Sequence, residues 1–105
     1  MTRPLQIEHT RNGSEGRYWA DLGDGFEAEM TYRIRADGAR IIDHTGVPKP
    51  FEGRGYALQL VRRAIADARE EDFRIVPLCP YVAVQFRRHP EWEDLRASPQ
   101  PPDRH

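Results

Sequence analysis

The sequence is short of several residue types that common sites and structures require. A single cysteine, Cys79, excludes an internal disulfide bond and a zinc site built from four cysteines. No run of about 18 apolar residues is present, and the first residues lack the apolar core of a signal peptide, so we expect a soluble, cytoplasmic protein without a membrane partner. No pair of histidines stands at metal-ligand spacing with a carboxylate, and we expect no metal site.

An excess of charge of either sign is also absent. Sixteen basic residues oppose seventeen acidic ones, which leaves a net charge of −1. A protein that binds nucleic acid needs positive charge to neutralise phosphates, so nucleic acid is not an expected partner. Lys49 is the only lysine, and arginine therefore carries almost all of the positive charge.

The length of 105 residues corresponds to one domain. We expect this domain to span residues 1–95. Residues 96–105 contain three prolines and no apolar side chain beyond Ala97, so we expect them to form a disordered tail.

Alternation of apolar and polar residues predicts strands in the first half of the chain. The clearest is 26–35, where five apolar side chains alternate with five polar ones and predict one buried and one wet face. Shorter strands are expected at 5–8, 17–22 and 39–45, separated by turn residues at 12–16, 23–25 and 37–38. Together these segments predict an antiparallel meander of about four strands.

The pattern changes after Pro48 and Pro50, which forbid a regular ladder or helix there. Apolar residues then recur at spacings of three and four, which predicts a helix from about 57 to 71. Residues 74–79 are mostly apolar and include the β-branched Ile75 and Val76, which predicts a strand, and its place after a helix makes a parallel pairing by a right-handed crossover plausible. Pro80 suits the first turn of a last helix over 81–89. The fold class expected is α+β.

The first candidate site is the glycine turn, residues 52–57, which opens the longer helix. Gly53 and Gly55 allow a ligand to approach the backbone closely, and free N–H groups at a helix start favour an anion such as a phosphate or pyrophosphate. A plain loop-to-helix turn is the alternative. The turn lacks the third glycine of the dinucleotide fingerprint and the Gly-Lys-Ser/Thr ending of a phosphate loop.

Three side chains are candidates for catalysis. Cys79 stands at the end of a strand and before a helix start, where a positive potential favours a nucleophilic thiolate. Tyr81, two residues later, is placed to donate or relay a proton, and His44 at the end of the last meander strand is placed to act as a base toward a substrate or Cys79. For Cys79 the alternative is a buried structural thiol, and for His44 a residue that packs or hydrogen-bonds at a strand end.

Four stretches taken together resemble the small GNAT-like acetyltransferases of the YjdJ type, the N-acetyltransferase domain-containing protein 1-like family. The stretches are residues 44–48, 52–57, 77–83 and 88–92. Most specific are Pro-Leu-Cys-Pro-Tyr within the third and His-Pro-Glu-Trp within the fourth. The resemblance implies a minimal GNAT fold: an antiparallel meander, a cofactor-binding helix, a parallel strand that splays away and a C-terminal helix.

The resemblance also implies acetyl-CoA as the ligand and assigns residues to it. The pyrophosphate is expected on the backbone of the glycine turn, with Val47 beside it, and Arg54 is expected to add charge. The backbone residues assigned are Gly53, Arg54, Gly55, Tyr56 and Ala57. Glu52 departs from the Gln or Arg that opens this motif in the superfamily.

A catalytic tyrosine found in the last helix of many superfamily members is absent, because Arg87 occupies its place. The catalytic candidates are therefore Cys79, Tyr81 and His44, with backbone amides near Leu78 as stabilisers of an oxyanion. The expected function is acetyl-CoA-dependent N-acetylation of an unidentified amine, by direct attack or through an acetylated cysteine. The alternatives are a non-catalytic CoA-binding module and a protein-interaction domain whose cleft edge takes an extended strand.

Overall fold

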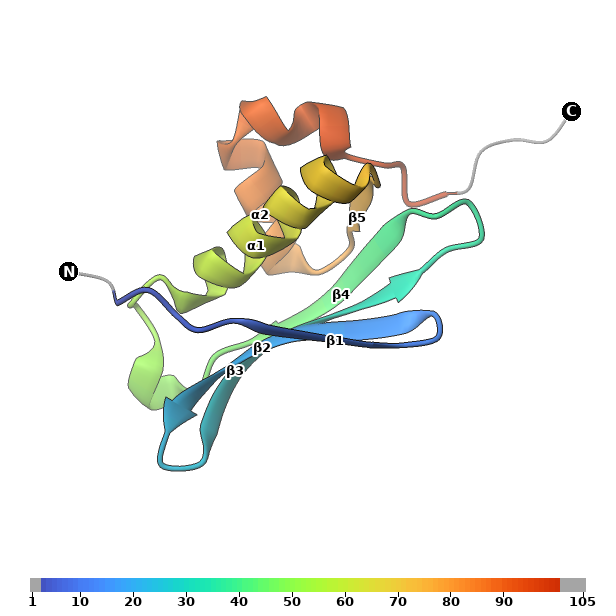
Figure 1. Cartoon of the computed structure of the whole chain (residues 1–105). Helices are drawn as coiled ribbons and strands as arrows, with labels where there is room; N and C mark the ends of the chain where they lie inside the picture. The colour runs from blue at the N-terminus through green and yellow to red at the C-terminus, as the bar shows by residue number, and fades with distance from the viewer. Residues whose placement is uncertain (1–2, 101–105) are drawn as a thin grey trace, which may run out of the picture.

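The computed structural model describes residues 3–100 and shows one mixed sheet with helices on one of its faces (Figure 1). Strands β1 (Glu8–Asn12), β2 (Glu15–Gly23), β3 (Phe26–Ile34) and β4 (Arg40–Gly46) form an antiparallel meander. A 3₁₀ turn, η1 (Lys49–Phe51), then leads to helix α1 (Tyr56–Glu71), strand β5 (Ile75–Pro77), helix α2 (Pro80–Arg88) and 3₁₀ helix η2 (Pro90–Leu95). The strand order is β1-β2-β3-β4-β5, and β5 is parallel to β4. The predicted meander, parallel crossover and α+β class are confirmed.

A single large core joins the helices to the inner face of the sheet. Alternate residues in the middle of β3, namely Ala28, Met30 and Tyr32, are buried as the alternation predicts, and the buried stripe of α1 packs against these side chains. The outer members of the predicted face differ, because Phe26 is exposed and Ile34 is only partly buried. Val82 and Phe86 bring α2 into the same cluster. Among residues 3–100, no helix combines the length and apolar character that a membrane crossing requires.

Two boundaries differ from the sequence prediction. The first strand is 8–12 rather than 5–8, because Leu5 and Ile7 pack against the core beside α1 while the following residues pair with β2. The tail predicted from residue 96 is attached at its start: the Ala97 N–H donates to the Ile75 carbonyl at 2.7 Å, and Ala97 is buried. Residues 101–105 of that predicted tail lie outside the described part of the chain.

The strands β4 and β5 separate after a short pairing, and this point is called the fork. They pair only from Arg40 to Ile42 and from Ile75 to Pro77. Beyond it β4 continues to Gly46, whereas the segment that follows β5 turns away from β4. In that segment the Cys79 N–H donates to the Ile42 carbonyl at 2.9 Å before α2 begins. The fork thus leaves the last residues of β4 without a strand partner on that side.

A β-bulge in β4 determines which side chains reach the fork. Tyr32 of β3 pairs with Ile42, but the preceding residue, Thr31, pairs with His44, so one residue of β4 is extra. The alternation is therefore shifted beyond the bulge. Thr45 pairs with the fully buried Met30 on the helix side of the sheet.

Candidate functional site

A pocket of about 360 Å³ lies where the end of β4, the start of α1 and the start of α2 meet. We call it the fork pocket. It contains all the residues predicted to bind a cofactor except Arg54, and it also contains Tyr81. The lining residues are Thr45, Val47, Phe51, Glu52, Gly53, Gly55, Tyr56, Ala57 and Tyr81.

The glycine turn presents a run of unused backbone N–H groups to this pocket. The 3₁₀ turn uses the N–H groups of Phe51 and Glu52, and the first bond of α1 is from the Gln59 N–H to the Gly55 carbonyl at 3.2 Å. Between them, the N–H groups of residues 53–58 have no hydrogen-bond partner within residues 3–100. Such a run at the start of a 16-residue helix favours the binding of an anion.

Left-handed backbone at two glycines produces this arrangement. Gly53 and Gly55 both have a φ of 79°, a conformation that costs other residues free energy. Gly55 is the N-cap of α1 and carries no capping side chain, so nothing of its own covers the first N–H groups of the helix. The backbone path by itself therefore favours glycine at both positions.

The charged residues of the turn do not take the predicted positions. The carboxylate-bearing Glu52 lines the pocket, whereas Arg54 does not. The Arg54 guanidinium donates to the Pro50 carbonyl at 3.3 Å, and its Cζ lies 5.1 Å from the centroid of the Phe51 ring. Arg54 thus stacks on an aromatic ring that lines the pocket instead of lining it directly.

Cys79 and Tyr81 are brought to the inner end of the fork pocket. The Cys79 thiol is only 7% exposed and lies 3.6 Å from the Oγ1 of Thr45, a lining residue. Burial raises the pKa of the Tyr81 phenol, and Arg88 acts in the opposite direction. Tyr81 therefore stays protonated at neutral pH and is able to donate a hydrogen bond into the pocket.

His44 is not brought to Cys79. The bulge turns its side chain to the outer face of the sheet, where it is 59% exposed and its Nε2 lies 3.9 Å from Glu29 Oε2. Thr45 takes the inward position that simple alternation along β4 would give to His44. The structure thus separates His44 from the thiol on which it was predicted to act.

The backbone N–H groups predicted to stabilise an oxyanion already donate hydrogen bonds within the protein. The Leu78 N–H donates to the Val76 carbonyl and the Cys79 N–H to the Ile42 carbonyl, both at 2.9 Å. Pro80 has no N–H. The nearest N–H groups without a partner in the described chain belong to Tyr81 and Val82 in the first turn of α2.

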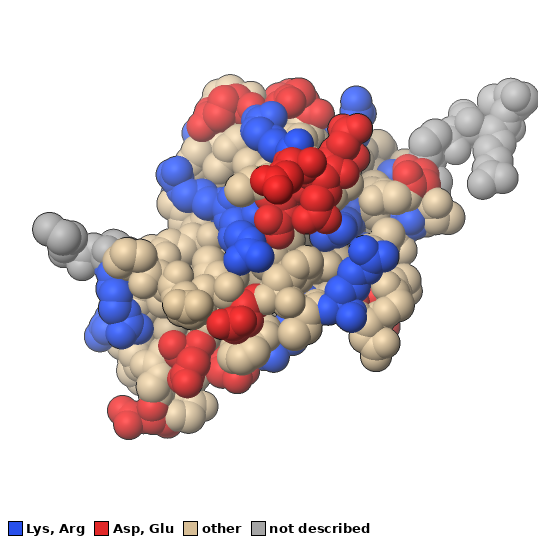
Figure 2. Space-filling view, in the orientation of Figure 1, with Lys and Arg blue, Asp and Glu red and all other residues tan. Residues whose placement is uncertain are grey.

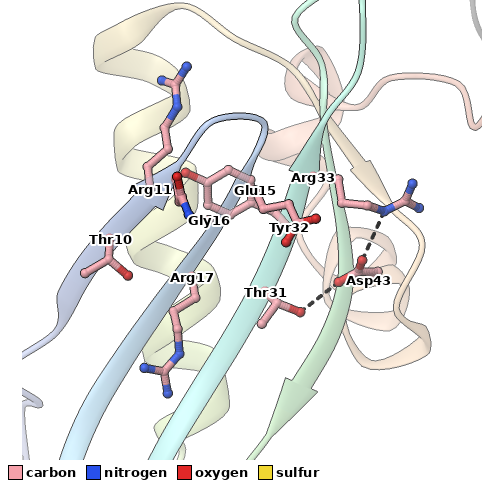
Figure 3. Close-up of a pocket in the computed structure, with 10 residues that line it drawn as sticks. Thr10, Arg11, Glu15, Gly16, Arg17, Thr31, Tyr32, Arg33 and Asp43 are labelled. Atoms are coloured by element: carbon pink, nitrogen blue, oxygen red, sulfur yellow. Dashed lines mark hydrogen bonds and ion pairs between the residues drawn. The ribbon is translucent and has the colours of Figure 1, made fainter.

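A larger hollow of about 510 Å³ lies on the sheet and contains none of the predicted site residues (Figure 3). Several of its polar side chains already have partners. Asp43 accepts hydrogen bonds from the Thr31 hydroxyl at 2.8 Å and from the Arg33 guanidinium at 3.3 Å. Arg17, which also lines it, is paired with Glu27 at 2.7 Å. The fork pocket, with its unused donors, is the stronger candidate.

Thr45 and Phe51 are site residues that the sequence reasoning missed. Thr45 was hidden because the bulge reverses the expected direction of the side chains at the end of β4. Phe51 lies between two prolines and the glycine turn, in a stretch without periodicity. The proximity of an aromatic residue to the glycine turn was the one signal available for it.

The fork and the glycine turn are features of a known fold. The structure is similar to the NMR solution structure of a GCN5-like protein from Staphylococcus aureus, with a TM-score of 0.65, 24% sequence identity and coverage of 92% of each chain. This likeness shows the GNAT fold, an open sheet whose strands part beside a glycine-opened helix. The fold predicted from the resemblance is confirmed.

The sequence comparisons define the family. The model of the GCN5-related N-acetyltransferase family matches residues 17–95. Protein NATD1 of Gallus gallus is 30% identical over 89 residues, which cover 83% of this chain and 78% of that protein. Protein NATD1 of Homo sapiens is 29% identical over 89 residues, with coverage of 83% and 76%. The chain therefore belongs to the GCN5-related N-acetyltransferase family.

Proposed function

We propose that this protein is an N-acetyltransferase that binds acetyl-CoA in the fork pocket and transfers the acetyl group to an amine. The observation that carries the proposal is the run of unused N–H groups at residues 53–58 opening into the same pocket as Thr45 and Tyr81. Family membership supports acyl transfer as the class of chemistry. The cytoplasm, where a lone thiol stays reduced, is the proposed compartment.

The residues of the pocket divide into a phosphate-binding part and a reacting part. The N–H groups of the glycine turn, held at the start of α1, would bind the pyrophosphate of CoA. Val47 and Tyr56 supply walls between that turn and the fork. The bound ligand supplies a thioester carbonyl, and the free N–H groups of Tyr81 and Val82 are the local donors for the negative charge that develops on its oxygen.

Two routes of transfer use this geometry. In the direct route, a neutral amine attacks the carbonyl carbon, the bond to the CoA sulfur breaks, and the Tyr81 phenol protonates the leaving thiolate. The proton that the amine nitrogen loses on forming the amide passes through water to the Tyr81 phenolate and restores the phenol. In the covalent route, the Cys79 thiolate attacks first and releases CoA, and the amine then attacks the acetylated Cys79 and restores the thiol. The covalent route requires the contact between Cys79 and Thr45 to open, because the thiol is buried.

Mass spectrometry of the intact protein incubated with acetyl-CoA separates the routes. Under the covalent route, the wild type gains one acetyl group and the Cys79→Ala variant gains none. Equal acetylation of both proteins, or unchanged turnover in the variant, removes Cys79 from the chemistry. A Thr45→Ser variant, which keeps the hydroxyl beside the thiol, serves as the matched control.

Release of free CoA in the presence of amines tests the activity itself. A polyamine and a lysine-containing peptide are suitable acceptors, because the amine is the only chemical group that the proposal requires. The buried thiol and the engaged amides of Leu78 and Cys79 favour one alternative, a CoA-binding module without turnover. That alternative predicts CoA binding without thioester loss for any acceptor, and the absence of CoA binding would contradict both readings.

A further inference from the structure

The first described residues form a strap across the start of α1. We call residues 3–7 the N-terminal strap. The Gln59 side chain holds it at two points: its Oε1 accepts from the Leu5 N–H and its Nε2 donates to the Arg3 carbonyl, both at 2.8 Å. Arg63 adds a bond to the Ile7 carbonyl at 3.2 Å. The strap therefore runs beside the helix instead of extending β1 within the sheet (Figure 1).

This path places a guanidinium group beside one wall of the fork pocket, although Arg3 is not itself a lining residue. The Cζ of Arg3 lies 6.0 Å from the centroid of the ring of Tyr56, the first residue of α1 and a lining residue of the pocket. On the other side, Arg54 stands over Phe51, and the centroids of the Phe51 and Tyr56 rings are 6.5 Å apart. Two guanidinium groups thus flank the two aromatic rings of one pocket.

The negative charge in the lining of the pocket indicates a role for these two arginines. Glu52 is the one ionisable carboxylate or guanidinium among the lining residues, and its negative charge opposes the binding of a phosphate to the glycine turn. Arg54 is partly used by the Pro50 carbonyl. The Arg3 guanidinium has no hydrogen-bond or ion-pair partner within residues 3–100, and basic side chains lie at the end of the molecule where the described chain begins (Figure 2).

We propose that the N-terminal strap is part of the cofactor site: Arg3 binds the phosphate groups of CoA, and Gln59 is the positioning residue that holds Arg3 there. This inference rests on the proposed function, because it assumes that CoA occupies the fork pocket. A guanidinium group binds phosphate oxygens through charge-assisted hydrogen bonds, which are stronger than neutral ones. Gln59 acts through the strap and does not itself touch the ligand.

Isothermal titration with CoA at low ionic strength tests the role of Arg3. We expect Arg3→Gln to weaken binding about 3- to 10-fold, and Arg3→Lys to restore most of the affinity because the charge returns. The loss should shrink as salt is raised, since the screening length falls from about 30 Å at 0.01 M to about 3 Å at 1 M. Arg11→Gln is the control of equal charge, because Arg11 donates to Gly13 in the β1–β2 turn and lines the hollow on the sheet instead of the fork pocket.

The positioning role of Gln59 predicts a distinct pattern of CoA affinities among the variants. Gln59→Ala is expected to release the strap and produce about the same loss as Arg3→Gln, with the same reduced dependence on salt. The double variant should bind no more weakly than the weaker single variant, because both changes remove one interaction. Pantetheine, which lacks phosphates, should bind all four proteins equally well.

The outcomes separate this inference from the function on which it rests. If the wild type binds no CoA, the proposed function fails and the role of the strap fails with it. If the wild type binds CoA and Arg3→Gln binds it equally well, or loses no more affinity than Arg11→Gln, the role of Arg3 alone is wrong. An equal loss with pantetheine would also overturn it, because the effect would then not involve phosphate.

Discussion

A Gly53→Ala substitution separates two effects of the glycine at this position, on the stability of the fold and on the binding of a phosphate. Gly53 has a φ of +79°, and a Cβ added there would meet no atom within 4 Å. The cost to folding is therefore the left-handed backbone alone, about 1–2 kcal/mol for an L-residue. For a domain of this size, each kcal/mol lowers the melting temperature by about 4–8 °C. The new methyl group also stands at the pocket, where it would keep a phosphate from the neighbouring N–H groups.

Gly38 provides a matched control for this change. Its φ is +92°, a Cβ added there also meets no atom within 4 Å, and it lies in the turn between β3 and β4 rather than at the pocket. Chemical denaturation should show similar losses of stability for Gly53→Ala and Gly38→Ala. Titration with CoA should show about a tenfold or greater loss for Gly53→Ala only, since hydrogen bonds to charged groups contribute about 1.5–3 kcal/mol. Equal CoA affinity in the two folded variants would refute the assignment of the glycine turn.

Two further predictions concern Gly16 and His9, which lie next to the Tyr32 side chain. Gly16→Ala would place a Cβ 2.3 Å from the Cζ of the buried Tyr32 ring, so we expect urea denaturation to show a loss of about 1–3 kcal/mol from overpacking, whereas an unchanged midpoint would show that the ring can move freely. Burial lowers the pKa of His9 below its ordinary value of 6.5, so the unfolded chain binds the proton more readily than the folded protein. Stability should therefore fall as the pH is lowered from 7 through 6.5 toward the folded pKa, and a His9→Phe variant measured by denaturation at each pH should lose that slope.

Local sequence patterns predicted most of the fold because each pattern is typical of one type of secondary structure. The alternation from 26 to 35 requires a strand with one buried face, and the observed β3 buries Ala28, Met30 and Tyr32 as expected. Apolar spacing likewise predicted α1. The first strand was misplaced because Leu5 and Ile7 alternate like a strand but pack beside α1, where Gln59 satisfies the backbone of Leu5.

The candidate site was predictable only where its function depends on the backbone. Gly53 and Gly55 were identified because few residues other than glycine adopt a positive φ at the start of a helix. The position of His44 on the outer face, away from Cys79, was not predicted, because a bulge is a tertiary feature that leaves no mark on the alternation of β4. Its other predicted role, as a base toward a substrate, stays a prediction. The proximity of Arg3 to Tyr56 was unpredictable for a similar reason, since the two residues are 53 positions apart and the strap held by Gln59 brings them together.

Strand β5 pairs with β4 over only a short stretch, and further backbone hydrogen bonds hold it in place at the fork. β5 pairs with only three residues of β4, from Arg40 to Ile42, and a strand of this length is weak by itself. Its outer edge is fixed by the Ala97 N–H, which donates to the Ile75 carbonyl, and its far end by the Cys79 N–H on the Ile42 carbonyl. The bond to the Ile42 carbonyl is the last backbone bond between β4 and the segment after β5 in the described chain, and the two segments part beyond it, where α2 begins. Beyond the fork, the end of β4 pairs with β3 on one side only, and Thr45, together with Val47 just after the strand, lines the pocket on the other side.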